Sequence, residues 1–134
     1  MRLGVVLVHY HTPDLAASAV ASLREDAATS KVELEIALVD NGSTAEGRGL
    51  LGRLEGVRLL DPGQNLGYAG AFNLGVKQLA KADAVAVMNP DVRVLPGCLG
   101  ALAAAVADGA GVAGPRFWWD RRGGFLLPPT EERG

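Results

Sequence analysis

Short apolar runs alternate with helical patterns along most of this chain. The apolar runs are rich in Val, Leu and Ala and lie at residues 3–8, 34–39, 57–60 and 84–88. Segments with apolar residues at helical spacing lie between and after them, at residues 13–24, 45–54, 68–79 and 98–107. This alternation is typical of βαβ units, which build an open, mostly parallel sheet with helices on both faces. We therefore expect an α/β fold, with residues 111–114 as a fifth strand.

The alternation stops after Pro115. Phe117, Trp118 and Trp119 follow, and then a charged end rich in Pro. A doubly wound sheet that stopped here would leave one edge bare, and open edges recruit partners. We therefore expect residues 1–116 to be the first half of a larger fold and residues 117–134 to be a tail or the start of a missing half. We also expect a homo-oligomer that associates through the two tryptophans.

Composition excludes several classes of protein. The chain has 134 residues, of which 49% are hydrophobic and 21% charged, so it suits one packed domain rather than a disordered chain. A net charge of −2 with scattered Lys and Arg argues against a nucleic-acid partner. The single cysteine, Cys98, cannot form an internal disulfide, which fits a reducing compartment. Residues 3–8 are too short for a signal-peptide core or a membrane span. We expect a cytoplasmic protein, with the inner face of the membrane as an alternative location.

Asn89, Pro90 and Asp91 directly follow the apolar run at residues 84–88. Pro cannot donate to a β-ladder and restricts the residue before it, so the strand should end there. In open α/β sheets, ligands bind beyond the carboxyl ends of the strands. The carboxylate of Asp91 is a hard oxygen ligand, suited to Mg²⁺ or Mn²⁺ that carries a phosphate. The same residues also suit a plain turn.

Asp40 ends the second predicted strand, and Asn41-Gly42 follows it. Asn-Gly supplies a tight turn whose backbone can approach a ligand closely. An Asp at this edge can accept hydrogen bonds from a base N–H or from a ribose hydroxyl. Ser43 or Thr44 can cap the next helix, but capping does not explain Asp40.

The segment at residues 65–75 combines glycines with two asparagines. Gly67, Gly70 and Gly75 each disfavour a helix by up to ~1 kcal/mol relative to Ala. Small residues let a helix pack closely on a strand, or let a phosphate approach the helix N-terminus. We attribute Gly70 and Gly75 to packing. Asn65 and Asn73 are harder to explain by packing alone.

His9 and His11 flank Tyr10 at the end of the first predicted strand. Two histidines at this spacing could hold a metal, but no Cys or third His lies nearby. A structural or substrate-lining role is therefore favoured. The first strand is not followed by Gly-x-Gly-x-x-Gly, and there is no Walker A sequence, which speaks against a dinucleotide-binding Rossmann unit and a P-loop.

Together these motifs resemble the family-2 glycosyltransferases of the GT-A fold, in their rhamnosyltransferase-like form. Residues 39–44 resemble the family's VDNGSTD segment, and residues 65–75 resemble its Asn-x-Gly segment with a second Asn-x-Gly. Residues 89–91 resemble its Asp-x-Asp motif. The likeness covers nearly everything up to about Arg116. One departure is Asn89, which replaces the first Asp of the motif. Asn89 can still hydrogen-bond to ribose, but it removes a charge near the metal.

The resemblance implies that this chain is the N-terminal, donor-binding half of a glycosyltransferase. The donor would be a nucleoside-diphosphate sugar of the UDP or dTDP type, and the acceptor a hydroxyl of a saccharide or a lipid-linked glycan. Asp40 would contact the base, and Asp91 would bind the divalent cation, Mn²⁺ or Mg²⁺, that holds the diphosphate. The expected site residues are His9, Tyr10, Asp40, Asn41, Gly42, Asn65, Gly67, Asn73, Asn89 and Asp91.

No carboxylate before Gly134 suits the catalytic base, since Asp120, Glu131 and Glu132 lie in a tail without periodic structure. We therefore expect the chain by itself to lack transfer activity. Two alternatives remain open. One is a non-catalytic nucleotide-binding or assembly module that pairs with another chain through residues 117–119. The other is a phosphate-binding domain of signalling type, which would want an acidic cluster where this chain has His9, Tyr10 and His11.

Overall fold

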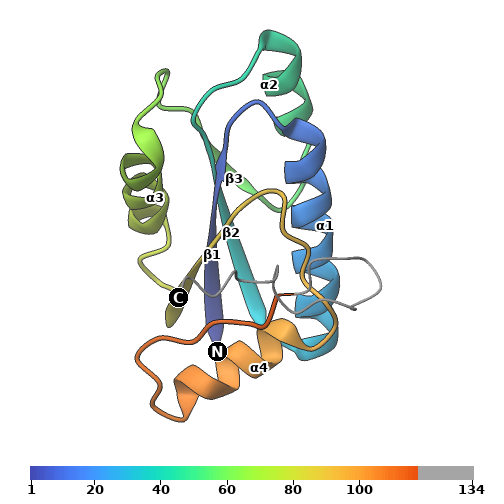
Figure 1. The fold of residues 1–134 in the computed structure, drawn as a ribbon, viewed down its shortest axis with the longest axis vertical. Coiled ribbons are helices and arrows are strands. Elements are labelled where there is room, and N and C mark those ends of the chain that lie inside the picture. The colour runs from blue at the N-terminus through green and yellow to red at the C-terminus, as the bar shows by residue number, and fades with distance from the viewer. Residues whose placement is uncertain (118–134) are drawn as a thin grey trace, which may run out of the picture.

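In the computed structural model, residues 1–117 are described, and they contain four parallel strands and four helices in alternation (Figure 1). The elements are β1 (Arg2–His9), α1 (Pro13–Ser30), β2 (Glu33–Asp40), α2 (Ala45–Leu51), β3 (Arg58–Leu60), α3 (Gly67–Gln78), β4 (Ala84–Met88) and α4 (Cys98–Ala107). The expected α/β fold is confirmed, as are the four predicted strands at residues 3–8, 34–39, 57–60 and 84–88.

The strands lie in the order β3-β2-β1-β4, and every pair is parallel. The chain leaves β1 through α1 to β2, continues to β3, and then crosses through α3 to the other side of β1, where β4 pairs. The strand order therefore reverses between β1 and β4. In open α/β sheets the crevice at such a reversal, beyond the carboxyl ends of the strands, is where ligands bind.

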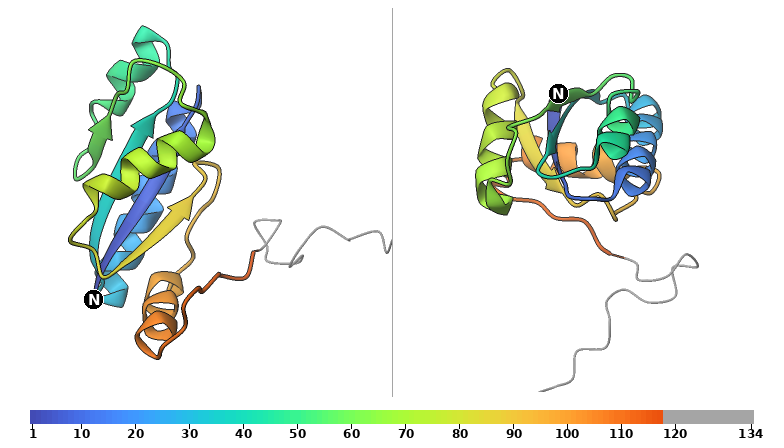
Figure 2. Two further views of the ribbon diagram at one scale, coloured as in Figure 1. Left: turned by 90° about the vertical axis from the view of Figure 1, so that its left-hand side faces the viewer. Right: turned by 90° about the horizontal axis from the view of Figure 1, so that it is seen from above.

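Apolar residues on both faces of β1 build two cores. Leu3, Val5 and Leu7 pack against α1, and Leu51 and Leu99 join the same cluster. Val6 and Val8 point the other way and pack beneath α3. A strand covered on both faces reads as a continuous apolar run for this reason. Figure 2 shows the result, with α3 on one face of the sheet and α1 and α2 on the opposite face. The helix α4 lies at the end of the sheet where β1 begins (Figure 1).

Two predicted helix ends and one predicted strand are wrong. The helix α1 runs to Ser30 rather than to residue 24, because its buried face continues through Asp26 and Ala27. The helix α2 ends at Leu51 rather than at residue 54. Residues 111–114 form no strand. Two of these four residues are glycines, and the side chain of Val112 is 93% exposed, so the segment has no apolar face to bury.

Within residues 1–117, β4 is an edge strand, because its only partner is β1. Val85 and Val87 on it are 41% and 50% exposed, since α3 covers β1 and β2 rather than β4. The predicted association surface at Trp118 and Trp119 lies outside the described residues. Among the helices of residues 1–117, none is both long and apolar enough to cross a membrane.

Gly75 lets α3 approach the sheet closely. A Cβ at this position would lie 2.5 Å from Cγ1 of Val6 and 3.4 Å from Cγ2 of Val39. The packing role predicted for Gly75 is therefore confirmed. The same role for Gly70 is wrong, because a Cβ there would meet the Leu66 side chain at 3.1 Å and no atom of a strand.

We expect Gly75→Ala to lower the free energy of unfolding by about 1–3 kcal/mol, because the added methyl group overpacks the contact with β1. Ala is the better helix former, so helix propensity alone predicts the opposite sign. Gly49→Ala is the matched control, since Gly49 lies in α2 and a Cβ there meets nothing within 4 Å. Urea unfolding of both variants measures the difference. Equal stability of the two variants would contradict the close approach of α3 to β1.

Candidate functional site

The carboxyl ends of the strands bring polar residues from distant parts of the chain to one edge of the sheet. His9 of β1 lies directly opposite Asp40 of β2. The strand β3 ends one position before the level of Asp40, so Asp61 follows at that level. The strand β4 ends two positions before the level of His9, and Asn89 follows it. All four residues therefore lie on the edge where the strand order predicts a ligand.

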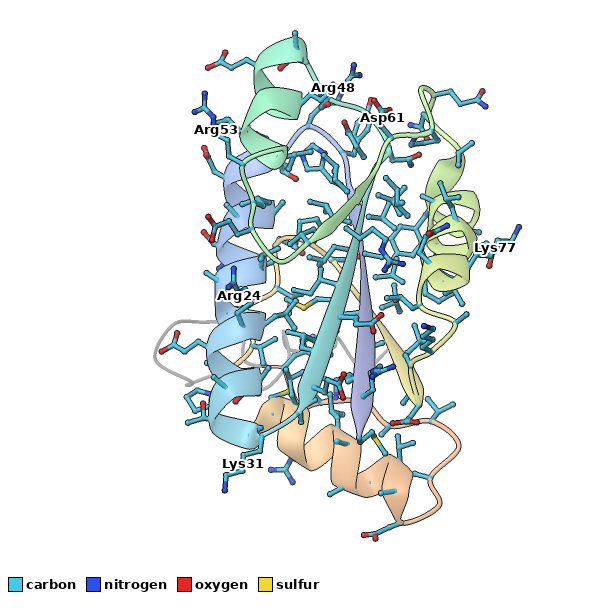
Figure 3. The ribbon with its side chains drawn as sticks, turned by 180° about the vertical axis from the view of Figure 1, so that it is seen from behind. Arg24, Lys31, Arg48, Arg53, Asp61 and Lys77 are labelled. Atoms are coloured by element: carbon cyan, nitrogen blue, oxygen red, sulfur yellow. The ribbon has the colours of Figure 1, made fainter. Side chains whose placement is uncertain are left out.

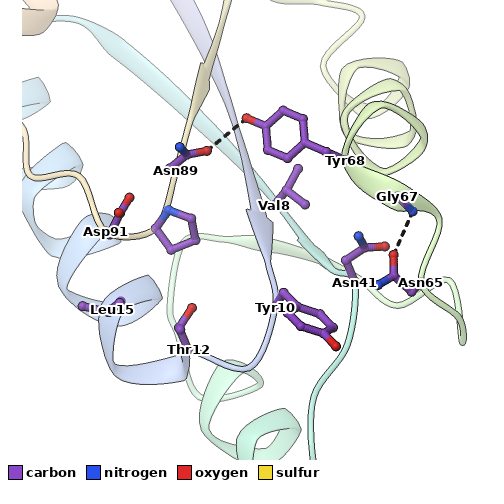
Figure 4. A pocket seen from close by; sticks show the side chains of 11 residues that line it. Val8, Tyr10, Thr12, Leu15, Asn41, Asn65, Gly67, Tyr68, Asn89 and Asp91 are labelled. Carbon is purple, nitrogen blue, oxygen red and sulfur yellow. Dashed lines mark hydrogen bonds between the residues drawn. The ribbon is translucent and has the colours of Figure 1, made fainter. Parts of the chain in front are cut away.

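Two adjoining pockets open at this edge. The larger, of about 490 Å³, lies between the ends of β1 and β4 (Figure 4). The smaller, of about 250 Å³, lies beside it at the ends of β2 and β3. They share Tyr10, Asn41 and Asn65 as a common wall. Eight of the ten predicted site residues line at least one of them: Tyr10, Asp40, Asn41, Gly42, Asn65, Gly67, Asn89 and Asp91.

Asp40 is a buried carboxylate in the wall of the smaller pocket. The residue is 3% exposed. Its Oδ1 accepts the backbone N–H of Gly42 at 3.2 Å and faces Nδ1 of His9 at 3.3 Å. Its Oδ2 accepts the hydroxyl of Ser43 at 2.6 Å. A carboxylate offers about four acceptor positions, so Oδ2 keeps one for a further donor.

The hydrogen bonds of Asp40 keep it charged despite its burial. Burial by itself raises the pKa of Asp40, but the bonds from Ser43, His9 and the Gly42 backbone outweigh it and hold the pKa below its usual range. Arg48 adds a cation, with Nε 3.8 Å from Oδ2. Asp40 is therefore a fixed negative charge at neutral pH.

His9 holds Asp40 in place and does not reach the pockets. Its ring is fully buried. The backbone N–H of Thr12 donates to Nε2 at 2.9 Å, so the ring proton sits on Nδ1 and faces Asp40. Both ring nitrogens are thus used inside the protein. Of the structural and substrate-lining roles expected for His9, its position fits the structural one, since the ring lines neither pocket and joins the end of β1 to β2 and to the start of α1.

Asn41, Gly42 and Tyr10 shape the wall that the two pockets share. Oδ1 of Asn41 accepts the backbone N–H of Leu66 at 2.7 Å, which fixes the segment before α3 against the sheet edge. A Cβ on Gly42 would lie 2.8 Å from the Tyr10 ring, so only glycine fits beneath it. Tyr10 itself stays 56% exposed and is available to a ligand.

The start of α3 is held by side chains. Oδ1 of Asn65 accepts the backbone N–H of Gly67 at 2.8 Å, and Gly67 has a φ of 70°, a conformation that favours glycine. Because Asn65 and Asn41 occupy the N–H groups of Gly67 and Leu66, these two groups are not free for a phosphate. Asn73 lies on the exposed side of α3 and lines neither pocket, so the structure does not bring it to the site.

Asn89, Pro90 and Asp91 lie in a turn that closes through the Val92 N–H and the Asn89 carbonyl, 3.1 Å apart. The predicted turn is confirmed, and within it Asp91 lines the larger pocket. The hydroxyl of Tyr68 donates to Oδ1 of Asn89 at 3.2 Å, across the pocket mouth (Figure 4). This bond leaves the amide N–H₂ of Asn89 free to donate.

Sequence reasoning missed several residues of the site. Ser43 was one of two candidates to cap α2, but Thr44 is the cap, with its hydroxyl 3.0 Å from the Gly47 N–H, while Ser43 bonds Asp40. Arg48 and Asp61 line the smaller pocket, and Nε of Arg48 lies 3.4 Å from Oδ2 of Asp61. Figure 3 shows these two side chains close together at the end of the sheet. Asp61 directly follows a predicted strand, so the rule that found Asp40 also finds it. Arg48 had no such signal.

The donor set fits a cation that arrives with its own ligands. Within residues 1–117, no three His, Cys, Asp or Glu side chains gather closely enough to hold a metal by themselves. Asp91 contributes one exposed carboxylate to the larger pocket. Mg²⁺ usually keeps several waters and is held by one or two carboxylates together with substrate phosphates. A single carboxylate therefore suits a cation bound to a diphosphate.

Comparison with known proteins agrees with this arrangement. The family described as Glycosyl transferase family 2 matches residues 4–133. Two relatives, from Mycobacterium tuberculosis strains CDC 1551 / Oshkosh and ATCC 25618 / H37Rv, are each named N-acetylglucosaminyl-diphospho-decaprenol L-rhamnosyltransferase. Each is 39% identical, over 61% of this chain and 31% of the relative, so the chain spans about a third of their length. The assembly-module alternative is not favoured by these matches. Because the family match takes in nearly the whole chain, including both strand-end aspartates, this chain belongs to glycosyl transferase family 2.

Proposed function

We propose that residues 1–116 bind the nucleoside-diphosphate sugar of a glycosyl-transfer reaction. The observation that carries the proposal is Asp40, which is held ionised in the wall of the smaller pocket with an acceptor position left on Oδ2. Uracil and thymine each present an imide N–H that such an acceptor suits, and a pocket of about 250 Å³ favours a single-ring base. The donor is therefore proposed to be of the UDP or dTDP type.

The larger pocket is proposed to take the ribose, the diphosphate and the sugar. Asp91 would hold a divalent cation, Mn²⁺ or Mg²⁺, together with phosphate oxygens and water. When bound, that cation offsets the charge that develops on the diphosphate leaving group. Asn89, whose Oδ1 is taken by Tyr68, presents its amide N–H₂ to a ribose or phosphate oxygen. Tyr10 lies between the two pockets and can contact the nucleotide in either.

The acceptor is proposed from the named relatives, which act on a decaprenol-linked saccharide diphosphate. By that likeness we propose a lipid-linked saccharide acceptor, and a place of action at the cytoplasmic face of a membrane. The general base that activates the acceptor hydroxyl is proposed to come from outside residues 1–117, as is the association surface at Trp118 and Trp119. The described carboxylates of the two pockets already have other partners or roles.

We expect the chain to bind UDP or dTDP at least about tenfold more tightly than ADP or GDP in the presence of Mn²⁺, which corresponds to ~1.4 kcal/mol. The match between Asp40 and the pyrimidine imide disfavours adenine, and the size of the smaller pocket, about 250 Å³, disfavours both two-ring bases. Isothermal titration calorimetry with the four nucleotides, with and without Mn²⁺, measures it. Equal affinity for all four, or binding of none, would count against the proposed donor.

We expect Asp91→Ala to remove the metal-dependent part of nucleotide binding and to leave the fold intact. Asp91 is exposed and its side chain supports no core, so its loss should not lower the melting temperature. Asp108→Ala is the matched control, since Asp108 is an exposed carboxylate at the far end of α4. Calorimetry and thermal unfolding monitored by circular dichroism provide the measurements. If the Asp91→Ala protein binds UDP–Mn²⁺ as tightly as wild type does, Asp91 is not the metal ligand.

We expect Asp40 to make stability depend on pH in the acid range. Its pKa is lowered in the folded state, so the stability that it contributes is present above its unfolded pKa, near 4, and is lost as the pH falls through the folded value. Ser43→Ala removes one of the hydrogen bonds that lower the folded-state pKa, so the folded and unfolded pKa values move closer together. The variant should therefore be less stable than wild type at pH 7, and should lose less stability than wild type as the pH falls below about 4. Urea unfolding from pH 7 to pH 3 measures both proteins. An identical acid limb would contradict the role of the Ser43 hydroxyl.

A further inference from the structure

We propose that Asp26 and Ser22 of α1 are positioning residues for Asp91, because they hold the loop that joins β4 to α4. The inference rests on the function proposed for Asp91 and extends it to two residues that touch neither pocket. Both lie on α1, and both bond backbone N–H groups more than 70 positions away in sequence.

Asp26 is a buried carboxylate that accepts two backbone N–H groups and, at 3.3 Å on Oδ1, the hydroxyl of Ser30. It is 3% exposed. Its Oδ1 accepts the Gly97 N–H at 2.6 Å, and its Oδ2 accepts the Leu99 N–H at 2.7 Å. Within residues 1–117, no Lys, Arg or His forms an ion pair with it. Its charge is instead met by the N-terminus of α4, where unpaired N–H groups and the helix dipole favour an anion.

The helix α4 needs this carboxylate because its own sequence supplies no cap. Its N-cap residue is Gly97, with a φ of 87° and no side chain to bond the first N–H groups. Asp26 therefore caps α4 from another helix. Leu99, 2% exposed, packs in the same core as α1 and closes the contact on its apolar side.

Ser22 anchors the same loop at a second point. Its Oγ accepts the Val94 N–H at 3.1 Å and donates to the Ala19 carbonyl at 2.8 Å. Residues 22 and 26 are four apart on α1 and so share one face of the helix. The loop at residues 92–95 has no helix or strand of its own. Besides these anchors and the turn at Asn89, it is held by the Arg93 guanidinium, which donates to the Pro90 and Val92 carbonyls, and by the Val94 side chain, which packs on the core.

Asp91 therefore sits between two fixed points, the end of β4 and the anchor at Val94. If the anchors are lost, the loop must be ordered when a diphosphate and its cation bind. The conformational free energy lost when the backbone of a single residue is fixed is roughly equal to the free energy of a tenfold change in affinity. Asp26 and Ser22 should thus act on the metal-dependent part of nucleotide binding, and should leave the contact at Asp40 unchanged.

The test compares Asp26→Asn and Ser22→Ala with Glu25→Gln, an exposed carboxyl change at the neighbouring position of α1. Backbone ¹⁵N order parameters of residues 91–95 report whether the loop is held. Calorimetry with UDP, with and without Mn²⁺, reports the binding.

We expect lower order parameters and about tenfold weaker Mn²⁺-dependent binding in both variants, with metal-free UDP affinity unchanged. Glu25→Gln should behave as wild type, and Ser22→Thr, which keeps the hydroxyl, should retain most of the wild-type order.

Three outcomes would contradict either this inference or the proposed function. Unchanged order parameters in Ser22→Ala, the milder variant, overturn the inference even if Asp26→Asn fails to fold. Lower order with unchanged Mn²⁺-dependent binding also overturns it, because Asp91 would then not depend on the anchors. A wild-type chain that binds no nucleotide contradicts the proposed function instead, and in that case the order parameters alone decide whether Asp26 and Ser22 hold Asp91.

Discussion

The requirement that Asp40 stay charged while buried organises the carboxyl edge of this sheet. An unpaired buried carboxylate is costly, so the surroundings must supply donors. Here they come from the end of β1 through His9, from the turn after β2 through the Gly42 N–H, and from Ser43. The same bonds join β1, β2 and the segment that leads into α2. Local folding and the proposed ligand contact therefore depend on one set of interactions.

The two pockets differ in how firmly the protein fixes the carboxylate in each of them. The carboxylate of Asp40 is fixed by internal hydrogen bonds before any ligand arrives. Such preorganisation suits the proposed selection of one base. The pocket around Asp91 offers a single exposed carboxylate on a turn. That arrangement suits a cation whose remaining ligands come from phosphate and water. The position of the Asp91 carboxylate then depends on the loop that carries it.

Side chains from elsewhere in the fold bond the starts of two helices. Asn41 bonds the Leu66 N–H just before α3, and Asp26 bonds the Gly97 and Leu99 N–H groups at the beginning of α4. Residue 66 is a leucine and residue 97 a glycine, so neither N-cap supplies its own side-chain bond. The two segments that border the larger pocket, before α3 and after β4, are thus attached to the sheet and to α1 by long-range bonds. The position of each therefore depends on the packing of the whole domain.

The sequence by itself determined the α/β class, all four strands and the two aspartates at strand ends. These features follow from local chemistry, namely apolar runs, a strand-ending Pro and the rule that ligands gather at carboxyl ends. It also contained a signal for Asp61 that was overlooked. The tertiary structure alone decided that β4 pairs with β1, and this pairing places the larger pocket. It also decided that the His9 ring is buried and that Asn73 lies away from both pockets. It also decided that α1 continues past residue 24, because Asp26 meets its partners in the segment before α4 and in the first turn of that helix. Each of these depends on contacts between residues far apart in the chain, and the periodicity of a segment carries no information about the partner that segment will meet.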